Sequence, residues 1–216
     1  MAARRGVGAN DGIVSTASLI VGVDSADGTR SEILIAALAG WAAGAMSMAG
    51  GEYLSVSSQA DSEAADLARE EQALRESPTA ETLELAQIYE RRGLARDLAG
   101  QVASQLMAKD ALAAHAREEL GFAEGAGSQP TLAAVASAAA YSVGAALPTL
   151  AAFFATTDWI VVSVPATAMG FLAALGALGA WLGGAPMLKP ALRGVVSGAL
   201  AMAVTATIGA LVGKAV

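Results

Sequence analysis

Hydrophobic residues form five stretches along this 216-residue chain, and one long polar segment separates the second stretch from the third. The stretches cover residues 6–23, 33–56, 131–155, 159–182 and 191–213. A helix needs about 20 predominantly apolar residues to cross the hydrocarbon core of a bilayer. The first stretch is the shortest, and it carries Asn10 and Asp11. The pattern predicts an all-α membrane protein with five transmembrane helices.

The polar segment, residues 57–129, is too charged to enter lipid and is expected to form three helices in water. The first of them is expected to continue the second apolar stretch without a break, because no Gly or Pro occurs from Glu52 to Ser77. The chain therefore divides into transmembrane helices 1 and 2 (residues 6–56), an inserted three-helix domain, and transmembrane helices 3 to 5 (residues 130–216).

Local signals give the ends of the other two helices in the polar segment. Ser77 and Pro78 are typical of an N-cap followed by proline at the first helical position. They predict a second helix over residues 78–92, which Gly93 closes as a C-terminal cap. A third helix is expected over residues 95–120.

Composition agrees with a membrane protein, since 55% of the residues are hydrophobic and the mean hydropathy is +0.51. The net charge is −7, and residues 57–129 hold 14 acidic and 7 basic residues, so the whole excess of negative charge lies there. This balance argues against nucleic acid as a partner and favours divalent cations. The chain has no cysteine, which excludes thiolate metal sites and iron–sulfur clusters.

Catalytic signatures are missing from the sequence. It contains no Walker loop and no evident Ser/His/Asp arrangement, so we expect neither an enzyme nor a prosthetic group.

The placement of basic residues predicts the topology. With five spans, the basic residues of the polar segment fall on the same side as Arg4, Lys189 and Arg193, and only Arg30 and Lys214 lie opposite. The N-terminus and the acidic domain are therefore expected in the cytoplasm. High alanine content and the lack of cysteine suit a bacterial inner (plasma) membrane.

Asp11 is the clearest ionisable residue inside a predicted span, where a charge costs at least about 2.5–3.5 kcal/mol. Ser15 lies four residues later on the same helix face. The pair suits a cation or proton pathway. The alternative is a residue near the membrane surface that caps or hydrogen-bonds a neighbour.

The second stretch carries a polar stripe at three- and four-residue steps, which places its members on one helix face. Its members are Gly44, Met48, Glu52, Ser55 and Gln59, followed by Glu63, Asp66 and Glu70. Such a line is what a guided cation route from mid-membrane into water would require. Ordinary packing is the alternative for Met48, since methionine fills gaps in cores.

The acidic domain offers candidate metal ligands, in which Glu81 and Glu84 lie at i, i+3 and His115 and Glu119 at i, i+4. The full candidate set is Glu70, Glu71, Glu81, Glu84, His115 and Glu119. Carboxylates with one imidazole suit Fe²⁺, Mn²⁺ or Zn²⁺. The alternative is a solvated charged helix face.

Glycines recur at four-residue spacing, at Gly8–Gly12, Gly40–Gly44, Gly179–Gly183 and Gly194–Gly198. This spacing lets helix backbones approach closely in lipid, either within one chain or across a dimer.

Four runs of the sequence stand out: residues 9–17 (ANDGIVSTA), 47–59 (SMAGGEYLSVSSQ), 88–94 (IYERRGL) and 115–121 (HAREELG). The first resembles the opening of the vacuolar iron transporter family, and the second is similar to the signature in its second membrane helix. The last two resemble its cytosolic domain. The resemblance covers nearly the whole chain.

The resemblance implies five membrane helices, a homodimer, and a three-helix cytosolic metal-binding domain after helix two. It implies an antiporter that exports cytosolic Fe²⁺ or Mn²⁺ in exchange for protons. By position, Asp11 and Met48 are expected in the pore, and Glu52 joins them because it lies within the signature. The family's cytosolic ligands correspond to Glu70, Glu81, Glu84 and Glu119.

Two departures from the family pattern concern the cytosolic site. The family has a further glutamate near Ala73 and a Met–Glu pair near His115 and Ala116. The resemblance therefore implies a site that is poorer in carboxylates, in which His115 substitutes as a ligand.

The first hypothesis is a dimeric secondary transporter whose partners are divalent metal ions, protons, lipid and a second copy of the chain. Its substrate is Fe²⁺ or Mn²⁺, with Zn²⁺ as a third candidate. A second hypothesis is a membrane-anchored metal buffer or sensor without transport. A weaker third is an enzyme resembling the di-iron carboxylate bundles, which use Glu-x-x-His on paired helices, whereas this chain has one histidine.

Overall fold

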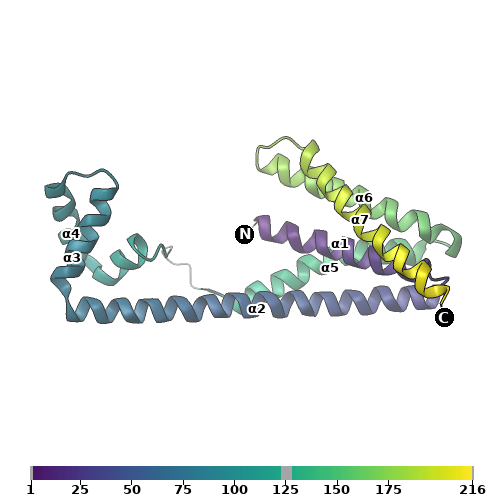
Figure 1. Cartoon of the computed structure of the whole chain (residues 1–216), viewed down its shortest axis with the longest axis horizontal. Coiled ribbons are helices and arrows are strands. Elements are labelled where there is room, and N and C mark those ends of the chain that lie inside the picture. The colour runs from purple at the N-terminus through teal and green to yellow at the C-terminus, as the bar shows by residue number, and fades with distance from the viewer. Residues whose placement is uncertain (1, 123–127, 216) are drawn as a thin grey trace. The chain divides into compact units, whose positions relative to one another are not determined.

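The computed structural model describes residues 2–122 and 128–215, and all regular secondary structure in these ranges is helical (Figure 1). The helices within these ranges are α1 (Ala2–Asp24), α2 (Arg30–Glu76), α3 (Pro78–Arg91), α4 (Arg96–Glu118), α5 (Pro130–Phe154), α6 (Thr157–Leu182) and α7 (Leu188–Gly213). The all-α prediction is confirmed.

Four of the helices are long and apolar enough to cross a membrane: α2, α5, α6 and α7. The chain is therefore a multi-pass membrane protein. Among the described residues α1 is not one of these four, so the structure supports four spans where the sequence pattern predicted five.

The helices divide into two compact units. The apolar unit comprises the described residues of Met1–Tyr53 and Thr131–Val216, and the charged unit is Leu54–Pro130. Helix α2 contributes its first part to one unit and the rest to the other, as a single 47-residue helix. This continuity confirms the prediction made from the lack of Gly and Pro beyond Glu52.

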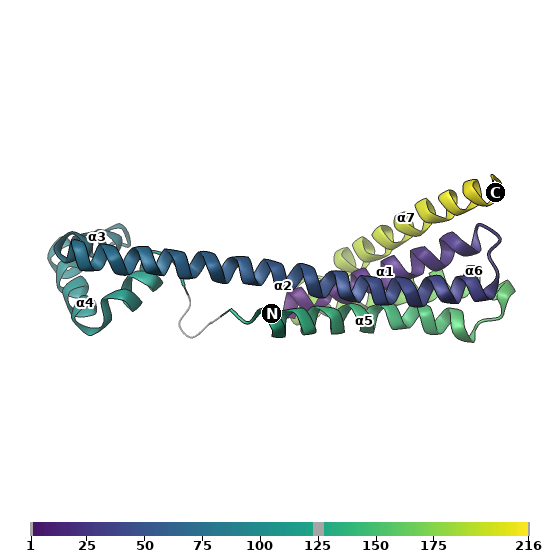
Figure 2. The same cartoon turned by 90° about the horizontal axis from the view of Figure 1, so that it is seen from below.

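In the apolar unit, α1 packs against α6 and α7, and α6 packs against α7, as Figures 1 and 2 show. Fully buried aliphatic side chains fill the centre, among them Ile13 and Ile20 of α1, Ile33 of α2 and Ile160 of α6. Large hydrophobic side chains such as Leu200 lie on the outside. An apolar exterior of this kind suits a lipid environment rather than water.

Glycines let the helices of the apolar unit approach closely. A Cβ atom added at Gly12 would lie 2.2 Å from the carbonyl oxygen of Tyr141 on α5, and one at Gly44 would lie 2.1 Å from the Tyr141 hydroxyl. The glycine spacing at these positions therefore serves packing within one chain, which was one of its two predicted uses.

In the charged unit, α3 packs against α4 around Leu85, Ile88 and Ala103. Pro78 is the first residue of α3, as predicted, and Gly93 follows the helix with a φ of +101°. Ser77 is the N-cap residue, as predicted, and its backbone carbonyl rather than its side chain accepts hydrogen bonds, from the amides of Ala80 and Glu81.

Helix α4 is interrupted, whereas the sequence predicted a single continuous helix. Asp110 has φ −165° and ψ 95°, which are not helical angles. Its carboxylate oxygen Oδ1 accepts a hydrogen bond from the backbone amide of Ala113 at 3.0 Å. An aspartate in this position acts as an N-cap, which competes with helix continuation. Residues 111–118, the α4 end segment, therefore form a separate short helix that carries His115.

Candidate metal site

His115 lies at the centre of a carboxylate group in the charged unit, and its side chain is fully buried. The ring nitrogen Nδ1 is 3.0 Å from Glu119 Oε2, with which it forms a hydrogen bond, and also 3.0 Å from Glu70 Oε1. The contact between Nδ1 and Glu70 Oε1 is not a hydrogen bond, and Glu70 Oε1 has no other hydrogen-bond partner. One ring nitrogen donates at most one proton, so one of the two carboxylates is left without a donor.

Glu70 comes from α2 and is 8% exposed. Burial raises the pKa of Glu70 most, the charge of Glu119 raises it further, and His115 acts in the opposite direction. Glu81 and Glu84 add smaller upward shifts to the same pKa. A buried carboxylate that is surrounded by other carboxylates and lacks a donor is stabilised by a cation.

Glu81 of α3 completes a group of three possible ligands. One ligand atom from each of Glu70, Glu81 and His115 lies within 4.8 Å of the others. Zinc–oxygen and zinc–nitrogen bonds of about 2.0–2.2 Å at tetrahedral angles place two ligands of one ion about 3.4 Å apart. The ligand atoms of the group would therefore move closer together to bind one ion, and α2, α3 and α4 each supply one of them.

The other two predicted ligands of the charged unit lie differently. Glu84 is exposed and is not one of the three grouped ligands, but its negative charge raises the pKa of Glu70. Glu71 is exposed and accepts a hydrogen bond from Arg75 at 3.0 Å. Its neighbour Glu70 points into the group, because adjacent residues on a helix face different directions.

Glu118 links the α4 end segment to α3. Its carboxylate accepts hydrogen bonds from Arg92 and, at 2.7 Å, from Arg117, and its side chain is 9% exposed. Burial on its own would raise the pKa of Glu118, but hydrogen bonds from the two arginines and from Tyr89 outweigh it and hold the pKa below its usual 4.5. These contacts hold the short helix that carries His115.

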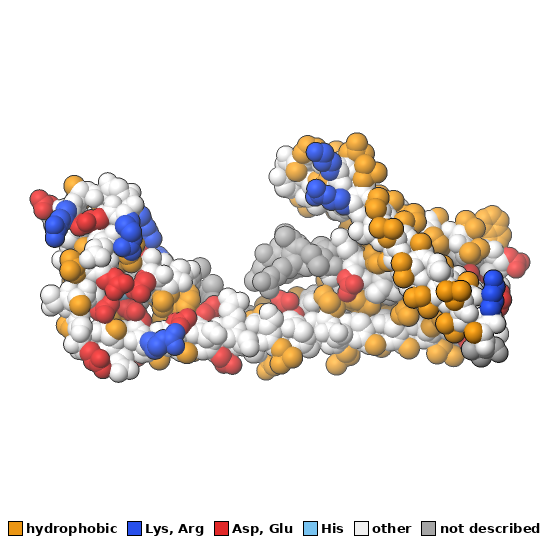
Figure 3. Space-filling model, viewed as in Figure 1, with side chains coloured by type: hydrophobic (Ala, Val, Ile, Leu, Met, Phe, Trp, Pro, Cys, Tyr) orange, Lys and Arg blue, Asp and Glu red, His pale blue; other side chains and the backbone are white. Residues whose placement is uncertain are grey.

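Figure 3 shows the charge distribution on one face of the molecule, with acidic side chains gathered over the charged unit and hydrophobic ones over the apolar unit. The stripe on α2 runs into this acidic region. Glu63 accepts hydrogen bonds from Gln59 at 2.8 Å and Ser128 at 3.3 Å, and Asp66 pairs with Arg69. Of the acidic members of the stripe beyond Tyr53, Glu70 is the one that joins the metal-type group.

The predicted pathway residues lie in the apolar unit. Asp11 is exposed in the single chain, and Ser15 is partly buried. The Ser15 hydroxyl donates to the Asp11 carbonyl at 2.6 Å and lies 2.8 Å from the Tyr141 hydroxyl. Met48 and Glu52 are partly exposed on α2.

Tyr141 is a polar residue that the sequence reasoning missed. It is 3% exposed on α5, and its hydroxyl contacts Ser15 of α1 while its ring covers Gly44 of α2. It therefore joins the Asp11–Ser15 side of α1 to the stripe on α2. The available signal was a single phenol within an apolar helix, where a buried hydroxyl needs a partner.

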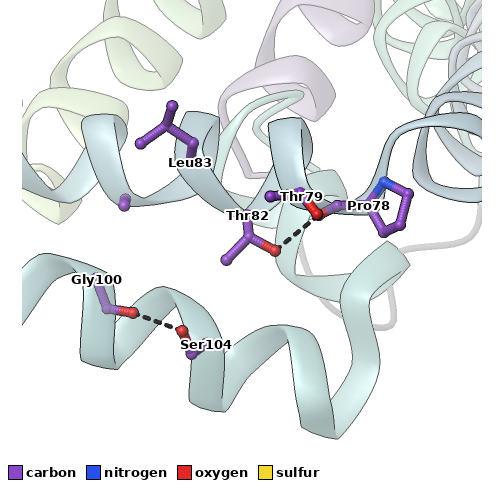
Figure 4. Close-up of a pocket in the computed structure, with 7 residues that line it drawn as sticks. Pro78, Thr79, Thr82, Leu83, Gly100 and Ser104 are labelled. Carbon is purple, nitrogen blue, oxygen red and sulfur yellow. Dashed lines mark hydrogen bonds between the residues drawn. The ribbon is translucent and has the colours of Figure 1, made fainter.

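A groove of about 450 Å³ lies between α3 and α4 and holds none of the predicted ligands (Figure 4). Its lining residues are Pro78, Thr79, Thr82, Leu83, Ala86, Gly100 and Ser104. The hydroxyls of Thr82 and Ser104 each donate to a carbonyl of their own helix at 2.8 Å. The groove therefore offers apolar and small side chains, which do not suit a metal ion.

The fold and the site define a multi-pass helical membrane protein that carries a carboxylate–imidazole group of metal-ligand type. The family model described as "VIT family" matches residues 6–210, and the chain belongs to that family of transporters, which are not enzymes. The family predicted from the four sequence runs is thereby confirmed.

Relatives resemble the chain over most of its length. A protein of Acanthamoeba castellanii named "Vacuolar iron transporter" is 44% identical over 210 residues, which are 96% of this chain and 77% of that protein. "Vacuolar iron transporter homolog 1" of Oryza sativa subsp. japonica is 40% identical over 92% of this chain and 68% of its own length. "Vacuolar iron transporter homolog 3" of Arabidopsis thaliana is 34% identical over 96% of this chain and 81% of its own length.

Proposed function

We propose that this protein is a secondary transporter that exports Fe²⁺, Mn²⁺ or both from the cytosol, in exchange for protons. Membership of the family and the names of the relatives support iron as the substrate. The observation that carries the proposal is the group formed by Glu70, Glu81, His115 and Glu119, in which a buried carboxylate oxygen lacks a donor.

The donor atoms limit the metal. Carboxylate oxygens and one imidazole nitrogen suit Fe²⁺, Mn²⁺ and Zn²⁺, whereas Cu⁺ prefers thiolate and thioether ligands. Ligands must lose protons before they bind a metal, so metal binding and proton release are linked. This linkage gives a physical basis for proton exchange.

The proposed route begins at the acidic group and follows α2 toward the membrane. Within the membrane it passes Met48 and Glu52 of α2 and Asp11 and Ser15 of α1, and Tyr141 connects these two helices. Methionine sulfur favours Fe²⁺ over the harder Mg²⁺ and Ca²⁺.

We further propose that α1 is a fifth membrane helix and that two copies of the chain form the pathway between them. The exposure of Asp11 and the open space around Gly50 and Gly51 in the single chain support this arrangement. The N-terminus and the charged unit would lie in the cytoplasm, and the membrane would be a bacterial plasma membrane.

Uptake of iron into proteoliposomes tests the proposal. With the vesicle interior kept acidic, the full chain should accumulate many Fe²⁺ ions per protein molecule, and collapse of the pH gradient should lower that amount. Empty vesicles under the same conditions serve as the control. Uptake that never exceeds the amount bound by the protein would contradict transport.

The same measurement addresses a metal buffer or sensor, the second candidate function. The acidic group favours this alternative because binding there needs no intramembrane carboxylate. A buffer binds a fixed number of ions per chain and is indifferent to Asp11→Asn. A transporter loses accumulation in that variant but keeps binding to the acidic group.

A further inference from the structure

We propose that His115 sets the metal preference of the acidic group, so that this chain favours Zn²⁺ and Fe²⁺ over Mn²⁺ more strongly than an all-carboxylate site would. The inference rests on the proposed function, because it concerns the metal bound by the same group. It adds discrimination against Mn²⁺ and a role for Zn²⁺, which neither the family nor the names of the relatives supplies.

The geometry assigns His115 a ligand role rather than a purely structural one. A histidine that only links helices would leave no carboxylate beside it without a donor, but Glu70 Oε1 is buried 3.0 Å from Nδ1 of His115 and has no hydrogen-bond partner among the described residues. At Nδ1 two carboxylates compete for one proton, each at 3.0 Å. An ion between Nδ1 and the carboxylates would balance Glu70, which a structural histidine leaves unpaired.

The ring has little freedom to leave this position. His115 is fully buried, and its backbone carbonyl accepts the amide of Glu119, which follows it by one helical turn. The same helix therefore holds the imidazole and a carboxylate at fixed spacing. Glu70 and Glu81 approach from two other helices, so the imidazole nitrogen faces the centre of the group.

The imidazole nitrogen of His115 then determines which divalent metal the group prefers. Affinity for nitrogen and oxygen sites rises from Mn²⁺ through Fe²⁺ and Co²⁺ toward Cu²⁺ and remains high at Zn²⁺. Imidazole suits zinc and iron, whereas carboxylate and water suit manganese, magnesium and calcium. One imidazole among carboxylates therefore selects against Mn²⁺, while the remaining carboxylates keep the negative charge that attracts divalent ions.

Competition titrations on the full chain in detergent test the proposal, with Zn²⁺, Fe²⁺ under anaerobic conditions, and Mn²⁺ as the probes. We expect His115→Glu to lower the ratio of Zn²⁺ to Mn²⁺ affinity about tenfold, which corresponds to roughly 1.4 kcal/mol. The control is Glu76→Gln, which changes an exposed carboxylate on α2 that bonds only to Gln72 in the described contacts. An unchanged ratio in His115→Glu would overturn the proposal.

Pulsed electron paramagnetic resonance of bound Mn²⁺ gives a second readout that folding defects do not imitate. The wild-type protein should show ¹⁴N coupling from a directly bound imidazole, and no such signal should appear in His115→Gln. If His115→Glu fails to fold, the wild-type spectrum decides alone, and a spectrum without ¹⁴N coupling refutes the ligand role.

These experiments distinguish a failure of the transport proposal from a failure of the His115 proposal. Nitrogen coupling together with no vesicle uptake would contradict transport but support His115 as a ligand. Vesicle uptake without nitrogen coupling would contradict the role of His115 and leave transport standing.

Discussion

At the residue scale, Glu70 combines burial, which disfavours the charged form of its carboxylate, with a position among possible metal ligands. Its carboxylate is buried, lies beside Glu119, and has an oxygen with no donor. Because its folded-state pKa is raised above 4.5, the folded protein holds its proton more tightly than the unfolded chain does. The stability contributed by this group is present below pH 4.5 and is lost as the pH rises through the folded pKa.

Replacing Glu70 with glutamine should separate stability from binding. At pH 7 the metal-free Glu70→Gln protein is expected to unfold at a higher temperature than the wild type, because the buried negative charge is gone. A saturating metal should stabilise the wild type by about 2.7 kcal/mol at 100 times its Kd, and the variant by much less. Thermal unfolding with and without Mn²⁺ measures both effects, and equal stabilisation of the two proteins would refute the assignment.

Glu118 should show the opposite pH dependence. Its folded-state pKa is lowered below 4.5, so its contribution is present above that pH and is lost as the pH falls through the folded pKa. Glu118→Gln is expected to lower the unfolding free energy at pH 7 by about 1.5–3 kcal/mol, the range for hydrogen bonds to charged groups. Unfolding measured in steps from pH 7 into the acid range checks this, with the more exposed Glu90→Gln as the control. A loss of the same size at every pH would contradict the charge-based explanation.

Tyr141 gives a prediction for the membrane part. Tyr141→Phe removes the hydroxyl that contacts Ser15 and should lower the unfolding free energy by only about 0.6 kcal/mol, the average for such bonds in membranes. Metal uptake should nevertheless fall, because the polar link between α1 and α2 is lost. Tyr53→Phe, which changes an exposed tyrosine on α2, is the matched control. Equal metal uptake by Tyr141→Phe and Tyr53→Phe would show that the Tyr141 hydroxyl is not part of the pathway.

The sequence predicted some of these residues and missed others for physical reasons. His115 and Glu119 could be paired because i, i+4 spacing fixes contact on one helix. The approach of Glu70 and Glu81 from other helices depends on tertiary packing, which the spacing rules do not encode. Tertiary packing also explains why the sequence did not distinguish Glu70 from Glu71. It explains as well why the contact between Tyr141 and Ser15 was not predicted.

At the scale of the elements, helix ends were predictable where the backbone demands a special residue. Pro78 begins α3, and Gly93 follows its end with a positive φ that other residues adopt at a cost. The interruption of α4 at Asp110 was not predicted, because the apolar pattern continues across it. Aspartate is favoured as an N-cap and disfavoured in helix interiors, which was the available signal.

The break at Asp110 gives a prediction about the α4 end segment. Asp110→Ala removes the cap and should destabilise the charged unit by about 0.5–2 kcal/mol. Metal affinity should fall with it, because the segment carries His115. Asp110→Asn keeps a capping oxygen and is the matched control. Calorimetric unfolding and metal titration report the two effects, and a loss of the same size in both variants would mean that the charge of Asp110, rather than its capping oxygen, matters.

At the scale of the whole molecule, one chain combines an apolar helical unit with a charged unit, and α2 runs through both. The apolar unit provides spans for a membrane, and the charged unit gathers the ligands. In the proposed function the charged unit alone would act only as a metal buffer, so the apolar unit must supply the route across the membrane. The proposed function therefore requires carboxylates within the membrane part as well as those around His115.

The initial rate of Fe²⁺ uptake by proteoliposomes that contain Asp11→Asn or Glu52→Gln tests this requirement most directly. Both variants are expected to bind metal at the group around Glu70 as the wild type does, yet to lose most of their uptake, while Glu76→Gln retains it. Uptake at the wild-type rate in both Asp11→Asn and Glu52→Gln would contradict the account.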